Sequence, residues 1–345
     1  KMLLVVSGYD SDKAGLTGSA WRTNVLKYAG AAGILDDVNS ALEQGLPRQY
    51  AAQMIYNTLD VNRVKWSKDS ESFDDVLNGG VKETVGHAYM GLTKSTGTLV
   101  TVKKDTLALD TNTIDGAESD AISTSTKNGV VSYKYADKFT KVSEDYTSLL
   151  GQKVKVLHEK NKTDKVFGVY ADPDSKVVAT AICDDLDTVS SSNEKIKVDG
   201  TEYKTDGALS SVQVFNFNQS AVAGKLASYI DNADVAPYSI KLIDNDDNGK
   251  IDRAVVTPFK VNEVTYVGST SLTLKGIGSV DKDDIILSDD VKKDDYVKVI
   301  AAANSVKEKR VASKVDVVTG TVESVKDSST VKVDGNWYKK AGSDA

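Results

Sequence analysis

Short runs in which β-branched or apolar residues alternate with polar ones fill most of the chain after residue 61. Clear examples are residues 98–102, 153–157, 195–198 and 296–300. A period of two places successive side chains on opposite faces of a strand, so each run predicts a strand that is buried on one face. The runs are separated by turn pairs at Asp199-Gly200, Asn248-Gly249 and Asp334-Gly335. Because such pairs favour tight hairpin turns, we expect antiparallel sheets.

The first sixty residues have a different pattern, with apolar residues at helical spacing. One helix is predicted over residues 20–33, with Trp21 on its apolar face and therefore in the core. A second helix is expected to begin at Pro47, a residue that the first helical turn tolerates. Later in the chain, apolar residues four apart predict one more helix over residues 219–230. The expected fold is α+β and mainly β: an N-terminal helical hairpin followed by tandem small antiparallel β-modules, barrel-like or sandwich-like.

The length of 345 residues exceeds that of one small core and predicts several domains. We expect a helical domain over residues 1–60 and a linker or module start over 61–94. These are followed by β-rich modules over residues 95–258, and then by a second β-module with the start of a further repeat over residues 259–345. Residues 197–204 and 332–339 share the pattern Lys-Val-Asp-Gly-x-x-Tyr-Lys, which favours true repetition over chance likeness of lysine-valine hairpins. Because the chain does not begin with Met and its last repeat is short, we expect a piece of a longer protein.

Charge and cysteine content narrow the classes of partner. The net charge of −7 and pI of about 5.1 disfavour binding to nucleic acid or to anionic lipid. No stretch reaches the roughly 20 apolar residues that a membrane-spanning helix needs. The single cysteine, Cys183, has no internal disulfide partner and is interpreted as a small buried hydrophobe. A single cysteine fits a secreted protein that is stabilised by packing and ions, and it is also compatible with a cytosolic location.

Residues 1–60 carry motifs that resemble an S-layer homology domain, the wall-anchoring repeat of Gram-positive surface proteins. The resemblance rests on residues 1–3 leading to 8–10, on residues 17–21, on residues 32–35, and on residues 46–52 with 54–57. The family commonly has a Thr-Arg-Ala-Glu signature at its second helix. Here Arg48 matches the arginine, whereas Pro47, Gln49 and Tyr50 differ from the signature.

The resemblance implies export, an extracellular place on the cell wall, attachment to a secondary wall polymer, and assembly into a two-dimensional lattice. Arg48 would then take part in holding the polymer, and Asp10 and Trp21 are further candidates for carbohydrate contact. Trp337 lies beside Tyr338 near a predicted hairpin edge and is the better candidate for an exposed aromatic residue.

The sharpest local motif spans residues 244–252, Asp-Asn-Asp-Asp-Asn-Gly-Lys-Ile-Asp. Its spacing matches the first nine positions of an EF-hand calcium loop, with Gly249 at the sharp turn. The ligands of a Ca²⁺ ion would be the side chains of Asp244, Asp246, Asn248 and Asp252 and the carbonyl of Lys250. The twelfth position falls on Val255, so the bidentate carboxylate is missing, and the flanks read as strands. An Asn-Gly hairpin with exposed acidic residues is the equally weighted alternative.

No catalytic motif stands out, and we expect a protein that is not an enzyme. The two histidines, His87 and His158, are too few for a familiar zinc site, and His158 is expected at the surface at a strand end. No Gly-x-Ser-x-Gly elbow surrounds a serine. Three functions remain in order of preference: a structural surface protein that self-associates into a lattice or filament, a wall-polymer anchor with a β-module stalk, and a fragment of a surface hydrolase.

Overall fold

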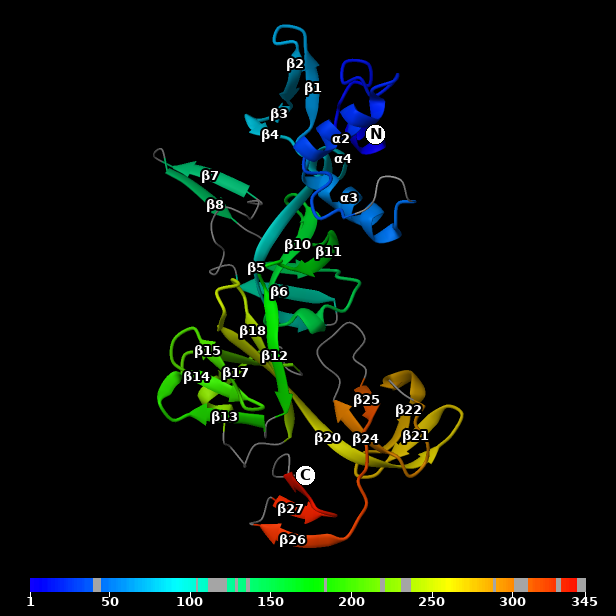
Figure 1. Ribbon diagram of the computed structural model, residues 1–345, viewed down its shortest axis with the longest axis vertical. Helices are drawn as coiled ribbons and strands as arrows, with labels where there is room; N and C mark the ends of the chain where they lie inside the picture. The colour runs from blue at the N-terminus through cyan, green and yellow to red at the C-terminus, as the bar shows by residue number, and fades with distance from the viewer. Residues whose placement is uncertain are drawn as a thin grey trace. The chain divides into compact units, whose positions relative to one another are not determined.

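The computed structural model describes residues 1–39, 45–103, 105–110, 123–127, 130–134, 137–182, 185–217, 221–230, 237–287, 290–300, 310–326 and 330–339 (Figure 1). The protein is mainly β, with several small antiparallel sheets and few helices. It divides into two compact units, residues 1–93 with 157–162, and residues 94–156 with 163–345. Cys183 lies outside the described residues. No helix in the described part of the chain has the length and apolar character that crossing a membrane requires.

The first unit contains the four α-helices of the described chain. They are α1 (Met2–Val6), α2 (Trp21–Ala31), α3 (Arg48–Asp60) and α4 (Val85–Met90), with strands β1 (Val64–Ser67), β2 (Ser72–Asp75), β3 (Leu77–Asn78) and β4 (Val81–Lys82). The two pairs β1–β2 and β3–β4 are antiparallel. Asn57 of α3 donates hydrogen bonds to the carbonyls of Ile34 and Asp36, which ties α3 to the segment after α2. A small core of seven buried residues, including Leu4, Ile34 and Val85, holds the unit together.

Two expectations for single residues were wrong. Trp21 is 47% exposed, because it occupies the first position of α2, whereas Ala29 in the last turn is the helix residue that is buried. His158 is fully buried, because the strand that carries it continues to Glu159. The His158 Nδ1 atom lies 3.0 Å from the carbonyl oxygens of Glu159 and Lys162, so the ring is held inside by backbone contacts.

The second unit is built around a central sheet that is buried on both faces. It contains β12 (Lys176–Ile182), β18 (Tyr238–Asp244) and β20 (Arg253–Val267) in that order, and β16 (Gln213–Asn216) pairs with both β20 and β17 (Ala221–Lys225). Alternate residues enter different cores: Ile243 and Val255 join one core, and Leu242 and Ala254 join another. A strand that is covered on both faces needs apolar side chains at successive positions, which explains the continuous apolar run at residues 254–256.

One face of the central sheet packs on a five-stranded sheet. Its strands are β5 (Leu92–Lys103), β6 (Thr106–Asp110), β9 (Lys138–Thr140), β10 (Lys153–Glu159) and β11 (Val166–Ala171), in the order β11-β10-β5-β6-β9. The core between them joins Leu99, Val154 and Phe139 to Ile243 and Val255. A separate hairpin, β7 (Ser123–Lys127) with β8 (Val130–Lys134), and a 3₁₀ turn at Thr147–Leu149 belong to the same stretch of chain.

The other face is covered by a small sheet of β13 (Leu186–Val189), β14 (Ser192–Val198), β15 (Thr201–Thr205) and β19 (Lys250–Ile251). The helix expected over residues 219–230 is wrong. Residues 221–225 form strand β17, and a 3₁₀ turn over Leu226–Tyr229 follows it. The pairing of Val214 with Gly224 and of Phe215 with Val222 shows that sheet pairing overrides the helical spacing.

β20 is a 15-residue strand that belongs to more than one group of strands (Figure 1). Residues 253–258 pair with β18, residues 259–263 pair with β24 (Tyr296–Ile300), and residues 264–267 pair with β21 (Ser271–Leu274). The later part packs with β22 (Gly278–Asp281), β23 (Ile285–Leu287) and β25 (Arg310–Lys314) around a third core, and a 3₁₀ turn covers Lys282–Asp284. A three-stranded sheet of β26 (Val322–Lys326), β27 (Thr330–Val333) and β28 (Asn336–Lys339) ends the described chain.

Candidate functional site

The motif at residues 244–252 forms the connection between β18 and β20. The last residue of β18 is Asp244, and β20 begins at Arg253. The turn needs left-handed backbone at Asp247 (φ +55°) and Gly249 (φ +78°), a conformation that Asp tolerates and glycine adopts freely. The flanking strands confirm that this loop lacks the two helices of an EF-hand.

Three carboxylates of the loop converge. One oxygen atom from each of Asp244, Asp246 and Asp252 lies within 4.8 Å of the other two. Asp244 is almost fully buried, and its oxygens accept hydrogen bonds from the backbone N–H groups of Asp246 (3.2 Å) and Gly249 (2.8 Å). A carboxylate oxygen has two lone pairs, so these bonds leave room for a cation.

Asp244 is buried, Asp252 is half-buried and Asp246 is exposed, and the closeness of their three carboxylates disfavours full ionisation of the group. Burial raises the pKa of Asp252 to about 6, and the neighbouring Asp246 and Asp244 add to this rise. Burial and the adjacent Asp244 also raise the pKa of Asp246. A bound divalent cation would stabilise the ionised form of the carboxylates and so reverse the direction of these pKa shifts.

The other two predicted ligands are placed differently. The Asn248 side chain donates to Asp246 Oδ2 (2.9 Å), and its oxygen accepts from the Lys250 backbone N–H (2.8 Å). The Asn248 oxygen is therefore engaged by the loop itself. Lys250 belongs to β19, which pairs in parallel with β15, and its Nζ lies 3.8 Å from Asp206.

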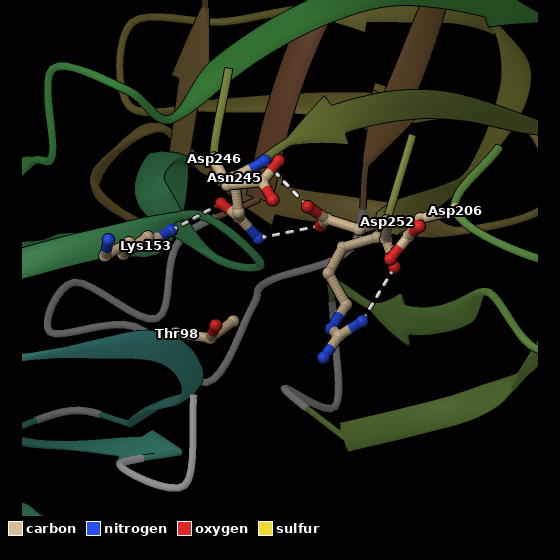
Figure 2. A pocket seen from close by; sticks show the side chains of 7 residues that line it. Thr98, Lys153, Asp206, Asn245, Asp246 and Asp252 are labelled. Carbon is tan, nitrogen blue, oxygen red and sulfur yellow. Dashed lines mark hydrogen bonds between the residues drawn. The ribbon is translucent and has the colours of Figure 1, made fainter. Parts of the chain in front are cut away.

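The sequence pattern did not single out Asn245, yet its side chain makes four hydrogen bonds beside the carboxylate loop (Figure 2). Its side-chain oxygen accepts from the Lys153 backbone N–H (2.6 Å) and from Ser175 Oγ (2.7 Å). Its side-chain nitrogen donates to the carbonyl of Gly151 (3.0 Å) and to Asp252 Oδ1 (3.1 Å). The side chain thereby ties the carboxylate loop to the β10 end of the five-stranded sheet. Partners more than 90 positions away in sequence leave no local signal at residue 245.

An open cleft of about 230 Å³ adjoins the loop. It is lined by Thr98, Lys153, Asp206, Asn245, Asp246, Asp252 and Arg253. Figure 2 shows Asp206 beside Asp252, and Arg253 donates to the backbone carbonyl of Asp252 at 2.8 Å. Carboxylates therefore outnumber cationic side chains near the loop, which favours a cation over an anion.

No protein-family model matches the chain, and no curated protein matches its sequence. The chemistry of the loop therefore has to be argued from its own groups. Carboxylate oxygens are hard donors, which suit Ca²⁺ or Mg²⁺ better than softer metals. The three converging carboxylate oxygens, one from each acidic residue, are fewer than the six to eight oxygens that Ca²⁺ takes, so second carboxylate oxygens, water or rearranged loop oxygens would complete the shell.

The structure does not bring the three carbohydrate candidates together by any contact. Asp10 Oδ1 accepts from the backbone N–H groups of Asp12 and Lys13, both at 2.9 Å, and so shapes a turn. Trp21 and Arg48 are the exposed first residues of α2 and α3. Among the described contacts, none joins Asp10, Trp21 and Arg48 to one another. Trp337 is 50% exposed, as the sequence led us to expect.

Proposed function

We propose that this chain is a structural protein of a bacterial cell surface, of the S-layer type, which self-associates into a lattice or filament on the wall. The observation that carries the proposal is β20, whose 15 residues contribute to the core with Leu242 and to the core with Val264. A continuous hydrogen-bonded strand resists bending between two cores better than a flexible linker does. Consecutive β-modules joined in this way suit a protein whose task is to hold a fixed spacing.

The N-terminal unit supports the surface location through its resemblance to an S-layer homology repeat. The acidic net charge of −7 is compatible with an environment in which calcium screens or bridges carboxylates. Tandem barrel-like or sandwich-like modules are part of the proposal, because surface layers are assembled from repeated building blocks.

Calcium is proposed as the ion of residues 244–252. Asp244, Asp246 and Asp252 would be its carboxylate ligands, and Asn248 and the Lys250 carbonyl would join after a local rearrangement of the loop. Calcium there would also order Asn245, which bonds to Asp252 and to Gly151. The ion would thereby stiffen the junction between the central sheet and the five-stranded sheet.

Negative-stain electron microscopy of the purified chain, with calcium and with chelator, tests this proposal. We expect ordered sheets or filaments with calcium and their loss after chelation. Single particles in both conditions, at high protein concentration, would count against self-association.

A wall-polymer anchor is the second candidate, and the exposure of Trp21 favours it. A tryptophan ring that is half open to solvent can stack on a sugar ring. Pull-down of the chain with isolated cell walls, compared with Arg48→Ala and Trp21→Ala variants, tests this function. Equal binding of all three proteins would remove these residues from any wall-binding site.

A further inference from the structure

Asn248 and Gly249 form an Asn-Gly pair in the exposed part of the loop between β18 and β20. In such a pair the glycine nitrogen can attack the side-chain carbon Cγ of the asparagine and close a succinimide ring. Glycine favours this reaction because it has no side chain to obstruct the approach. A Cβ added at Gly249 would meet nothing within 4 Å, so the rest of the chain does not crowd the reacting peptide.

Three hydrogen bonds lie on the atoms that this ring closure would change. The Gly249 N–H donates to Asp244 Oδ2 at 2.8 Å. Asn248 Oδ1 accepts from the Lys250 backbone N–H at 2.8 Å, and Asn248 Nδ2 donates to Asp246 Oδ2 at 2.9 Å. Asp244 is almost fully buried, so its carboxylate is held in place. The attacking nitrogen, the carbonyl oxygen and the leaving nitrogen are therefore each fixed by a partner.

Two of these partners match what the reaction needs. An amide nitrogen becomes a nucleophile only when its proton is removed, and a carboxylate within hydrogen-bond reach can accept that proton. Asp244 has this position at the Gly249 nitrogen. Negative charge then develops on Asn248 Oδ1, where a backbone N–H donor lowers the barrier as in an oxyanion hole. The Lys250 N–H has that position.

We propose that the chain modifies itself at Asn248, converting this asparagine to an aspartyl or isoaspartyl residue without a second enzyme. Asp244 takes the proton from the Gly249 nitrogen, the nitrogen bonds to Cγ of Asn248, and the Cγ–Nδ2 bond breaks. Ammonia leaves with the proton that the nitrogen lost, which solvent water returns to Nδ2. Water then opens the ring: its hydroxyl group adds to one ring carbonyl and its remaining hydrogen to the ring nitrogen. The sum is hydrolysis of an amide, so nothing is oxidised or reduced.

Ring opening at the side-chain carbonyl leaves a carboxylate at position 248. This group adjoins the converging carboxylates of Asp244, Asp246 and Asp252 and adds a hard oxygen donor to the loop. The reaction itself requires neither calcium nor self-association, so it does not rest on the proposed function.

A second Asn-Gly pair, Asn78-Gly79, provides a comparison within the same molecule. It is exposed at the turn between β3 and β4, and Asn78 Nδ2 donates to Glu83 Oε1 at 3.3 Å. Among the described contacts, no carboxylate accepts from the Gly79 N–H, and no backbone N–H donates to Asn78 Oδ1. This pair therefore has the same reactive groups without the base and the oxyanion donor. A third pair, at residues 128–129, lies outside the described residues.

Peptide mass spectrometry of the full chain, kept near neutral pH with chelator, follows the conversion at both pairs in one sample. The chelator keeps divalent cations away from the Asp244 carboxylate. In the folded chain we expect Asn248 to convert about tenfold or more faster than Asn78, because a positioned base and an oxyanion donor each contribute at least that factor. In urea that unfolds the chain, the two pairs should convert at equal rates.

Asp244→Asn tests the base directly, because an amide cannot take the proton. We expect conversion at Asn248 to fall to the rate at Asn78. Asp247→Asn is the matched control: it removes the same charge from the same loop, but Asp247 pairs with Lys176 rather than with a reacting atom. Its rate should equal that of the wild type. Circular dichroism checks that both variants fold.

A rate at Asn248 that exceeds the rate at Asn78 only in the folded chain, and that Asp244→Asn but not Asp247→Asn lowers, supports self-modification. Equal rates at the two pairs in the folded chain, or a rate at Asn248 no faster in the folded chain than in urea, overturn it. A folded Asp244→Asn variant that converts as fast as the wild type overturns it as well. If Asp244→Asn fails to fold, the comparison of folded and urea-unfolded wild type decides alone.

Discussion

Replacement of Asn245 by alanine should be among the most destabilising single changes in the second unit. The side chain is 8% exposed and makes four hydrogen bonds, two as donor and two as acceptor, so its capacity is filled. The alanine variant leaves the Lys153 N–H and the Gly151 carbonyl without these partners. Each net bond contributes about 1 kcal/mol, and each buried orphan adds to the cost. We therefore expect a loss of about 4 kcal/mol in the free energy of unfolding.

Urea unfolding followed by intrinsic fluorescence measures this loss, and hydrogen exchange of the Lys153 amide shows whether it arises at the junction. Asn262→Ala is the control, because its side chain donates one hydrogen bond, to the carbonyl of Lys275 (2.8 Å). The control should lose about 1 kcal/mol. An Asn245→Ala variant no less stable than the control, with unchanged Lys153 exchange, would refute the reasoning.

Three further predictions concern the loop and its neighbours. Calcium should raise the melting temperature of the chain, and Asp244→Ala combined with Asp246→Ala should abolish the rise; equal melting with calcium and with chelator would contradict the proposed ion. Without calcium, the raised pKa of Asp252 means that its contribution to stability is present below about pH 4 and is lost as pH rises through about 6. That loss should be about 1–2 kcal/mol after allowance for partial exposure, and urea titrations should show a shallower pH profile for Asp252→Asn. In urea unfolding, Gly151→Ala should lower the free energy of unfolding by about 3 kcal/mol and Gly200→Ala by about 1 kcal/mol. Both glycines have positive φ, but only at Gly151 would an added Cβ meet side chains, the nearest at 2.7 Å. Equal losses in the two variants would show that the crowding at Gly151 is relieved.

The period-two runs predicted the mainly β character correctly, and the Asp-Gly pairs at Asp199 and Asp334 lie at hairpin turns. These signals are local, because a strand shows its alternation and a turn shows its glycine within a few residues. The helix over residues 219–230 was wrong because spacing alone could not reveal the pairing of β17 with β16. The burial of His158 likewise depends on where its strand ends and on what packs over it.

The convergence of Asp244, Asp246 and Asp252 follows from their spacing around one turn, which is why the sequence pattern could suggest it. Asn245 could not be found in the same way, since Gly151 and Lys153 approach it only after the five-stranded sheet has packed on the central sheet.

Electron microscopy of isolated bacterial wall fragments incubated with the chain and calcium tests the central claim most directly. The proposed function predicts a regular lattice on the fragments that disappears with chelator and does not form with the Asp244→Ala, Asp246→Ala double variant. Bare wall fragments under all three conditions, with the chain remaining in solution, would contradict a surface-layer role.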